Sequence, residues 1–252
     1  QEQNSVEAFG HVRFKQGDTL TLTCDYAQYD GQEQMMRARR NVVLRHRQQT
    51  LYTDSLDYDR MYDNAYFFEG GKLIDGKDVL VADWGESNPP SREAAFYYKV
   101  RMRSGKDVVD TDTLFYDTRL SLAHVVGPSK ITSGDNVINT TDAYLDSKSD
   151  SSKLFGRSTI INKEKVIVGD SLYHNSKTGI SEGFGNVIYT DTLNKNSLTC
   201  DHLFYDDNTG YGFATRRALM KECSQKDTLY VHADTLKLYT FNINTDSVYR
   251  KV

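Results

Sequence analysis

The sequence predicts an all-β protein in which antiparallel strands stack into two facing sheets. Three observations support this fold class. A phrase such as "DTLFYD", at residues 112–117, returns many times along the chain with a nearly constant period. Apolar residues around each copy alternate with polar ones, as in strands with one buried face. Turn-forming residues separate the copies, and no amphipathic helical pattern is present.

The repeat is best seen from the aspartate at the head of each phrase, which we number position zero. Eight such aspartates follow one another at nearly regular intervals: Asp25, Asp54, Asp83, Asp112, Asp142, Asp170, Asp201 and Asp234. Eight similar phrases near one period indicate a repeat architecture, in which each unit buries its apolar face against its neighbours.

The first strand of each repeat surrounds this aspartate. Position −3 is apolar except at Asn139, and holds Leu22, Leu51, Leu80, Val109, Ile167, Leu198 and Val231. Position +2 holds Leu56, Leu114, Leu172, Leu203 and Leu236, and position +4 often holds tyrosine. Positions −3 and −1 share one strand face, whereas +2 and +4 share the other. We therefore expect a bulge or bend near the aspartate that points both halves inward.

The second strand of each repeat is rich in β-forming residues, with Gly or Asn near its middle. Examples are "EAFGHVRF" at 7–14, "RARRNVVL" at 37–44, "AHVVGPSKI" at 123–131, "LFGRSTI" at 154–160, "SEGFGNVIY" at 181–189 and "FATRRALM" at 213–220. Eight repeats of two strands give roughly sixteen strands, which we assign to one domain over residues 1–252. Residues 7–14 lack a preceding first strand and residues 241–252 begin another repeat, so we expect the natural chain to be longer.

The stacked aspartates allow two interpretations. Repeated Asp binds calcium in β-rolls of nonapeptide repeats, but the period and glycine content here do not fit that pattern. We therefore predict a structural role, in which each carboxylate accepts hydrogen bonds from backbone N–H groups at the bend. No metal site is expected.

Composition excludes several other classes. The net charge of −4 gives no sign of nucleic-acid binding, and no apolar run is long enough for a membrane span. The three cysteines cannot form a complete disulfide framework; Cys24 and Cys200 share position −1 and are interpreted as small buried residues, while a Cys200–Cys223 contact stays open.

Catalytic patterns are also missing. The six histidines are dispersed, with no Ser/His/Asp spacing, so we expect no enzyme activity. Residues 76–93 form the one irregular segment and are interpreted as a longer loop rather than a lid or partner contact. The basic stretch at 35–47 is interpreted as a solvated strand face, the alternative being a contact with sugar and phosphate.

The first repeat resembles a known family. "FGHVRFKQGDTLTLTCDYAQYD", residues 9–30, is similar to the glycine- and aspartate-containing pattern of the OstA/LptA family, and it matches at Gly10, Val12, Gln16, Gly17, Leu22, Asp25 and Tyr29. Segments 51–86 and 239–250 look like the longer OstA-like proteins of Bacteroidota. The pattern recurs along nearly the whole chain, which is longer than a minimal family member and therefore leaves the oligomer number open.

The resemblance implies a fold and a function. The fold is an elongated two-sheet antiparallel β-jellyroll that is open along one seam. The function is a periplasmic bridge, which can associate with the outer membrane and carries the acyl chains of lipopolysaccharide without catalysis or cofactor. The partners are lipopolysaccharide and other bridge proteins or further copies, joined by edge-strand addition, and no nucleic acid. The apolar residues given above at positions −3 and +2 are the candidate groove lining.

One alternative stays open. A structural β-repeat scaffold or adhesin-like stalk would have the same repeats but a filled interior, whereas a lipid carrier would keep an apolar groove open at one seam.

Overall fold

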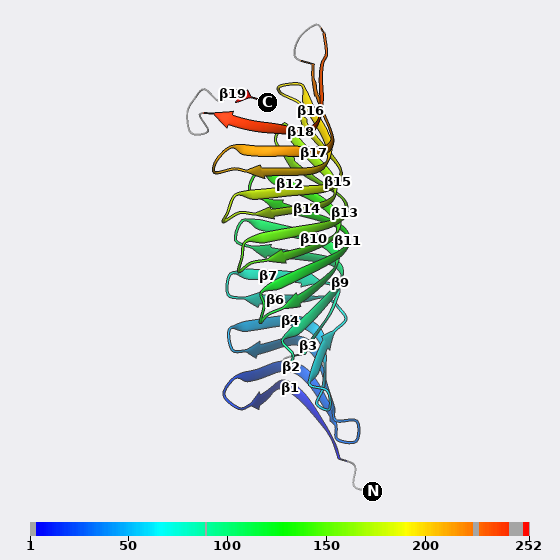
Figure 1. Ribbon diagram of the computed structural model, residues 1–252. Helices are drawn as coiled ribbons and strands as arrows, with labels where there is room; N and C mark the ends of the chain where they lie inside the picture. The colour runs from blue at the N-terminus through cyan, green and yellow to red at the C-terminus, as the bar shows by residue number, and fades with distance from the viewer. Residues whose placement is uncertain (1–3, 89, 224–226, 242–248, 252) are drawn as a thin grey trace. The chain divides into compact units, whose positions relative to one another are not determined.

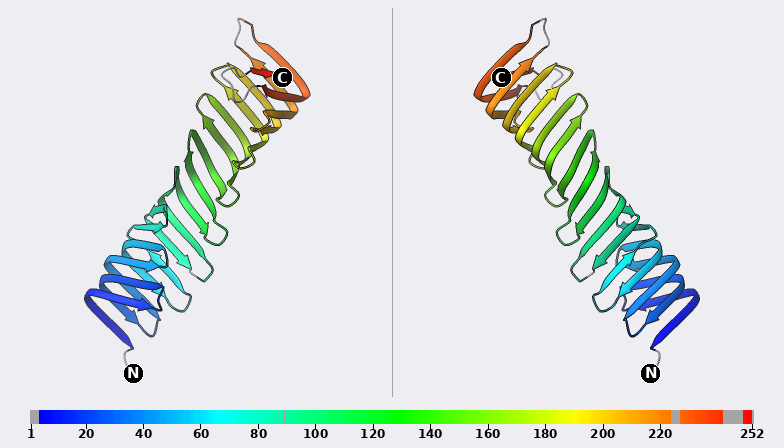
Figure 2. Two further views of the ribbon diagram at one scale, coloured as in Figure 1. Left: turned by 90° about the vertical axis from the view of Figure 1, so that its left-hand side faces the viewer. Right: turned by 90° about the vertical axis from the view of Figure 1, so that its right-hand side faces the viewer.

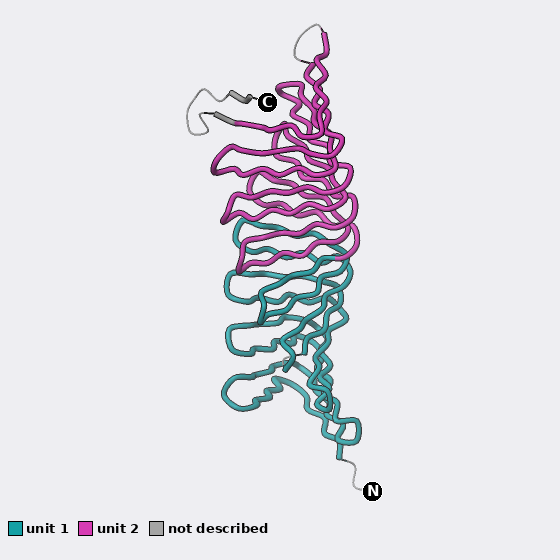
Figure 3. The backbone as a smooth tube through the Cα atoms, viewed as in Figure 1, with its two compact units in different colours: residues 1–125 teal, residues 126–252 magenta. Residues whose placement is uncertain are grey.

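The structure is a computed structural model that describes residues 4–88, 90–223, 227–241 and 249–251. The strands pair in antiparallel fashion, as in β1–β2, β3–β4 and β15–β16, and no helix occurs among the described residues. The all-β antiparallel prediction is confirmed (Figure 1). The chain divides into two compact units, residues 1–125 and 126–252, which are described separately (Figure 3). The assignment of one domain to residues 1–252 stays a prediction.

Unit 1 consists of strands that follow the chain order. They are β1 (Ser5–Gln16), β2 (Leu20–Asp30), β3 (Met35–His46), β4 (Gln49–Asp59), β5 (Asn64–Phe67), β6 (Gly71–Asp75), β7 (Asp78–Ala82), β8 (Trp84–Asn88), β9 (Glu93–Ser104) and β10 (Asp107–Asp117). Strand β4 pairs with both β5 and β6, and β9 pairs with both β7 and β8, so two repeat strands are each divided in two.

Strand β11 (Leu122–Ser133) contains the division between the units. Unit 2 continues with β12 (Asn136–Asp146), β13 (Ser151–Asn162), β14 (Lys165–Asn175), β15 (Ile180–Asp191), β16 (Asn196–Asp206), β17 (Tyr211–Glu222), β18 (Leu229–Phe241) and β19 (Tyr249–Lys251). Each strand from β12 to β19 pairs with the next one along the chain, as the ladder of hairpins in Figure 2 shows. Residues 242–248 and 252, where we expected another repeat to begin, lie outside the described residues.

A bulge bends the long strands at their middle. Between β3 and β4 the register passes from Arg39↔Ser55 to Val42↔Thr53, so Arg40 and Asn41 oppose the single residue Asp54. Both bulge residues have positive φ, 63° and 51°, a conformation that turns the strand sharply. The bend predicted near the aspartate is present, and the left-handed residues lie on the neighbouring strand.

The same left-handed feature recurs through both units. One residue with positive φ, or two in succession, occurs in the middle of second strands. The first of them is glycine in some strands and a larger residue in others. The members are Gly10/His11, Arg40/Asn41, Tyr98/Lys99, Gly127, Gly156, Gly185/Asn186 and Arg216/Arg217, where a single name marks a strand with one such residue. The Gly or Asn seen in mid-strand is thus explained by the backbone conformation.

Because of this bend, the two halves of a strand lie in two facing layers. The first layer consists of the strand halves that run from a short turn to the bulge. The short turns of unit 1 are residues 17–19, 47–48, 76–77 and 105–106. The second layer comprises the halves between the bulge and the four-residue turns (31–34, 60–63 and 118–121 in unit 1). Leu22 of the first layer and Leu56 of the second belong to one buried cluster, so the layers share a core.

Burial follows the predicted parity. In β10, Val109, Thr111 and Leu114 are 5%, 6% and 0% exposed, whereas Asp112 between them is exposed. Positions −3, −1 and +2 therefore all point into the core, as the bend requires.

One aspartate of the repeat was assigned one residue too late. In β12 the buried residues are Ile138, Thr140 and Ala143, which places Thr141 at position zero. Asp142 is the following residue, and the apparent exception Asn139 is an outward-facing residue. With this correction, the interval from Asp112 to Thr141 equals the interval from Thr141 to Asp170.

The interpretation of residues 76–93 as a loop was wrong. Most of the segment is strand, since it contains β7 and β8 on either side of Asp83. Two glycines beside one ring explain the irregular sequence: ideal Cβ atoms at Gly71 and Gly85 would approach the Phe67 ring to 2.5 and 2.6 Å. The divided strands make room for this ring. Because glycine has no side chain, Gly71 and Gly85 interrupt the alternation of apolar and polar residues that would indicate a strand.

Candidate lipid-facing interior

The candidate groove residues all lie on inward-facing strand positions. Nine are buried, and Leu51, Ile167 and Val231 are half-buried. In unit 1, Leu22, Leu51 and Leu56 join one apolar cluster; in unit 2, Ile167, Leu198, Leu203, Val231 and Leu236 join another. Leu80, Val109, Leu114 and Leu172 are buried elsewhere in the interior. The structure thus brings these side chains inward, where they pack against one another.

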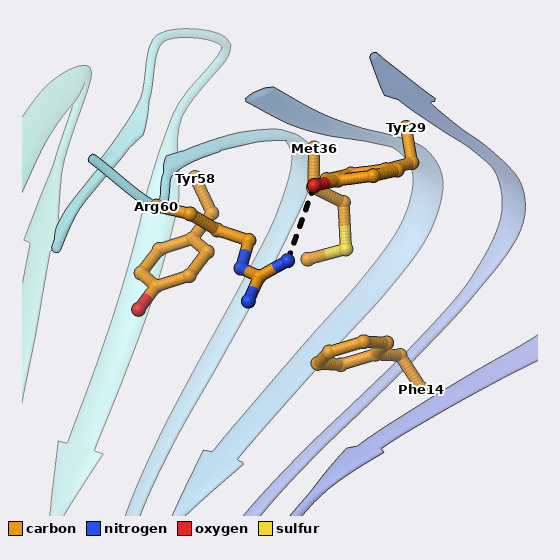
Figure 4. A pocket seen from close by; sticks show the side chains of 5 residues that line it. All are labelled: Phe14, Tyr29, Met36, Tyr58 and Arg60. Carbon is orange, nitrogen blue, oxygen red and sulfur yellow. Dashed lines mark hydrogen bonds between the residues drawn. The ribbon is translucent and has the colours of Figure 1, made fainter. Parts of the chain in front are cut away.

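A cavity opens between the layers in unit 1, near the ends of the strands. Its volume is about 120 Å³, and its lining is mainly apolar. Figure 4 shows Phe14 from β1 on one side and Tyr29, Met36 and Tyr58 from β2, β3 and β4 on the other. Phe14 lies in the first layer and the other three in the second. The cavity therefore marks a place where the two layers leave space between them.

Arg60 supplies the one charged group of this lining. It lies in the turn after β4, and its guanidinium donates a hydrogen bond to the Tyr29 hydroxyl at 3.1 Å. The guanidinium carbon is also 5.8 Å from the centroid of the Tyr29 ring. Arg60 is exposed, and none of the ion pairs of the described residues involves it. An apolar wall with a cation at its mouth suits an anionic amphiphile.

Tyr58 completes the mouth of the cavity. Its hydroxyl donates a hydrogen bond to Asp63 at 2.7 Å, and burial raises its pKa to about 12, with Asp63 adding to the shift. The sequence pattern included tyrosine at position +4, which here is Tyr29 and Tyr58, but it did not indicate Phe14, Met36 or Arg60. Their convergence depends on the facing of two layers, which no local pattern contains.

The aspartates at position zero contact the bulge of the next strand. In four pairs a bulge side chain of that strand is the donor: Asn41 Nδ2 to Asp25 (2.7 Å), Lys99 Nζ to Asp83 (2.9 Å), Asn186 Nδ2 to Asp170 (2.8 Å) and Arg217 Nε to Asp201 (2.9 Å). A backbone donor, as we expected, is present at Asp54, which accepts from Asn41 N at 3.1 Å. That these residues fix the bend stays a prediction.

A second polar ladder was missed by the sequence reasoning. Position +5 carries Asp or Asn at the end of first strands, and its carboxylate or amide oxygen accepts from backbone N–H groups of the following turn. The members are Asp30, Asp59, Asn88, Asp117, Asp146, Asn175 and Asp206. The hydrogen bonds from backbone N–H groups that we predict at position zero are thus accepted mainly at position +5. The regular interval of the Asp and Asn residues at +5 in the sequence could have revealed this.

The remaining reactive groups do not form a catalytic arrangement with the cavity. Cys24, Cys200 and Cys223 are free thiols, and burial raises the pKa of Cys200 to about 11. In the part of the chain that the structure describes, no cluster of three metal-ligating side chains occurs. No described helix has the length and apolar character needed to span a membrane.

Three comparisons relate this chain to known proteins. Among solved structures, LptH, described as the LptA-homologous periplasmic component of the lipopolysaccharide transport device of Pseudomonas aeruginosa, matches at 12% identity and a TM-score of 0.39. That match covers 42% of this chain and 81% of LptH. No curated protein matches. Residues 1–112 match the family model described as OstA-like protein. Over fewer than half of its residues, this chain is therefore similar to the OstA-like family.

Proposed function

We propose that the protein is a periplasmic lipid-binding component of a lipopolysaccharide-transport bridge, and that acyl chains enter between its two layers. The observation that carries this proposal is the apolar cavity between Phe14 and the Tyr29–Met36–Tyr58 wall, with Arg60 at its mouth. The OstA-like match of residues 1–112 supports it. No step of the proposed function needs a catalytic residue or a cofactor.

Binding of an acyl chain between the two layers requires the layers to separate further. The cavity of about 120 Å³ is smaller than the roughly 300–1,000 Å³ of typical small-ligand pockets. Each methylene that replaces water contact with apolar contact contributes about 0.8 kcal/mol, which favours an acyl chain that displaces the packed side chains. Leu51, beside the same core cluster, is only half-buried and would extend the lining.

The partners follow from the same proposal. Lipopolysaccharide would supply the acyl chains, and other bridge proteins or further copies would add by edge-strand pairing, because an unpaired strand edge offers free N–H and C=O groups. The proposed location is the periplasm, in association with the outer membrane.

Photo-crosslinking tests the proposal. A benzoylphenylalanine at Tyr58 faces the cavity, whereas one at Phe115, which is 39% exposed on the outward side of β10, lies on neither the cavity nor the outer side of the first layer. We expect lipopolysaccharide adducts from position 58 and none from position 115. Equal labelling, or no labelling of a protein with an unchanged β-sheet circular dichroism spectrum, would overturn the acyl-chain proposal.

A second candidate function is a structural scaffold. The filled interior favours it, since Leu22, Leu56 and Leu114 are 0%, 1% and 0% exposed. In that case unfolding stability should be independent of added lipopolysaccharide, whereas a lipid carrier is stabilised by its ligand.

A further inference from the structure

The outer side of the first layer in unit 1 carries a concentration of positive charge. Its cationic side chains point away from the core because they alternate with inward-facing residues: Lys72, for instance, lies between the buried Gly71 and the core-facing Leu73. We call this surface the basic face. Its cations are all exposed and are Arg13, Lys15, Arg45, Lys72, Arg101 and Arg103.

The strand register places these cations in two rows. One row runs through Arg13, Thr23, Val43, Tyr52, Lys72, Val81 and Arg101, which are successive cross-strand partners. The other row contains Lys15, Arg45 and Arg103 with Thr21, Thr50, Ile74 and Val79 between them. Since neighbouring strands lie about 4.8 Å apart, cations within a row are separated by about 10 or 19 Å. Such a spacing distributes the charge evenly over a sheet surface.

Few carboxylates neutralise the basic face. Asp110 pairs with Arg101 at 3.4 Å, and Asp18 in a turn pairs with Lys15 at 3.1 Å. The other four cations have no ion-pair partner among the described residues. By contrast, Arg37 and Arg39 on the second layer pair with Glu33 and Asp57. The basic stretch at 35–47 is therefore divided between two surfaces, and only Arg45 belongs to the basic face.

Composition does not explain this charge. Residues 1–125 contain 16 Lys and Arg against 20 Asp and Glu, so unit 1 as a whole is acidic. The equivalent outward positions of unit 2 are largely neutral, and include Val137, Thr159, Ile161, Val166, Val168, Ile188 and Thr199. Lys130 and Lys221 are the cations there. The same fold thus builds this surface with or without charge, which marks the basic face as a feature of unit 1.

Apolar side chains lie between the cations at the centre of the face. Tyr52 and Val81 flank Lys72 and are 42% and 44% exposed. Tyrosine, short aliphatic side chains and basic residues together suit the headgroup region of a bilayer, where cations contact phosphate and apolar groups enter the interface.

We propose that the basic face docks onto a phospholipid bilayer that carries anionic headgroups. A bilayer fits better than a nucleic acid, because the face is a sheet surface with one exposed aromatic ring at its centre and no loop or helix that would enter a groove. This docking does not depend on acyl chains entering the interior, since it uses the opposite side of the first layer.

Vesicle sedimentation with the full chain tests the proposal. The face variant replaces Arg45, Lys72 and Arg103 by Gln. The matched control replaces Arg40, Arg92 and Arg119, which are exposed at the bend or in turns, and removes the same charge. We expect binding to phosphatidylglycerol vesicles and not to phosphatidylcholine vesicles. Each cation near such a surface contributes about 1 kcal/mol, so the face variant should bind about 100-fold more weakly.

The control variant should retain nearly all binding. Equal losses in both variants, or no binding of the unaltered chain to phosphatidylglycerol vesicles at low salt, would overturn the proposal. So would tighter, face-dependent binding to a short DNA duplex than to the vesicles. A failed crosslink at Tyr58 with intact vesicle binding would instead reject only the lipid-carrying proposal.

Discussion

At the residue scale, the contact between Asp201 and Arg217 joins a residue at position zero to the bulge of the next strand. Arg217 donates from Nε to Oδ2 at 2.9 Å and from its terminal nitrogen to Oδ1 at 2.5 Å, so the fork of the guanidinium meets the carboxylate with two bonds. These bonds lower the pKa of Asp201. Arg217 itself has a φ of 58°, a left-handed conformation that costs free energy in a residue other than glycine.

Removing the donor should change how Asp201 titrates. In an Arg217→Gln variant we expect the pKa of Asp201 to rise toward the ordinary value of 3.8, because the charge-assisted bonds are lost. In the unaltered protein the lowered pKa stabilises the fold above about pH 4, and this contribution disappears as pH falls through the folded-state pKa. Carboxyl NMR titration measures the shift directly.

Arg216 provides the control for this titration. It has the same backbone conformation and charge but makes only a minor contribution to the pKa of Asp201. An Arg216→Gln variant that raised the pKa as much as Arg217→Gln would show that general charge, and not the paired bonds, is responsible.

Gly71 is a second residue whose side chain, or lack of one, decides local packing. A methyl group there would lie 2.5–2.7 Å from the Phe67 ring. We expect Gly71→Ala to destabilise the protein by about 1–3 kcal/mol, as overpacking does. Urea unfolding measures the loss, and a smaller aliphatic residue in the double variant Gly71→Ala/Phe67→Leu should recover part of it. No recovery would place the strain elsewhere.

At the element scale, the strand is the unit that sequence predicts well here. The positions around the repeated aspartate indicate the two buried halves and the bend between them, because alternation is a local property of a strand. The same reasoning failed at Asp142, because position zero of this repeat holds Thr141 and the aspartate after it was assigned instead. It also failed at β8, where Gly85 stands at the core position +2 and the ring of Phe67 from another strand fills the space. The cavity needs residues from four strands and could not be read from any one of them.

The bulge in β13 gives a prediction about an element. Gly156 has a φ of 71°, and a methyl group there would also lie 3.3 Å from the Thr141 hydroxyl. We expect Gly156→Ala to cost about 1–2 kcal/mol, because a Cβ disfavours the left-handed conformation. Gly156→Asn should cost less, since asparagine tolerates this region.

Chemical denaturation of both variants checks this order. Lys153→Ala, an exposed site on the same strand, should change stability by less than about 0.5 kcal/mol. An alanine at 156 that is as well tolerated as asparagine would show that the bulge can relax to a right-handed conformation.

At the scale of the whole molecule, stability is built from contacts between successive strands. Within each unit, nearly every strand pairs only with its neighbours in the chain order, so local damage should stay local. Leu56, which is 1% exposed, offers a test in unit 1. Truncating such a leucine to alanine typically costs about 2–5 kcal/mol.

We expect Leu56→Ala to speed amide hydrogen exchange in β3 to β6 and to leave β14 to β17 unchanged. Mass spectrometry of peptides from both regions measures this, with Thr50→Ala, an outward position on the same strand, as control. A uniform increase along the chain would mean that the protein opens as one cooperative unit.

The lengths of the turns carry a last consequence. Apart from the divided strands and β18 and β19, all second strands share one length from β1 on, and all first strands share another from β2 on. The described four-residue turns do not vary, and neighbouring ones are joined by backbone bonds such as Arg60 N to Gln34 O. The short turns, by contrast, differ in length. Most of them have two residues, but the turn at 17–19 has three and the turn at 192–195 has four. Insertions and deletions during evolution are therefore expected to gather at the short turns, and duplication of one whole repeat lengthens the protein while every inherited core residue keeps its place.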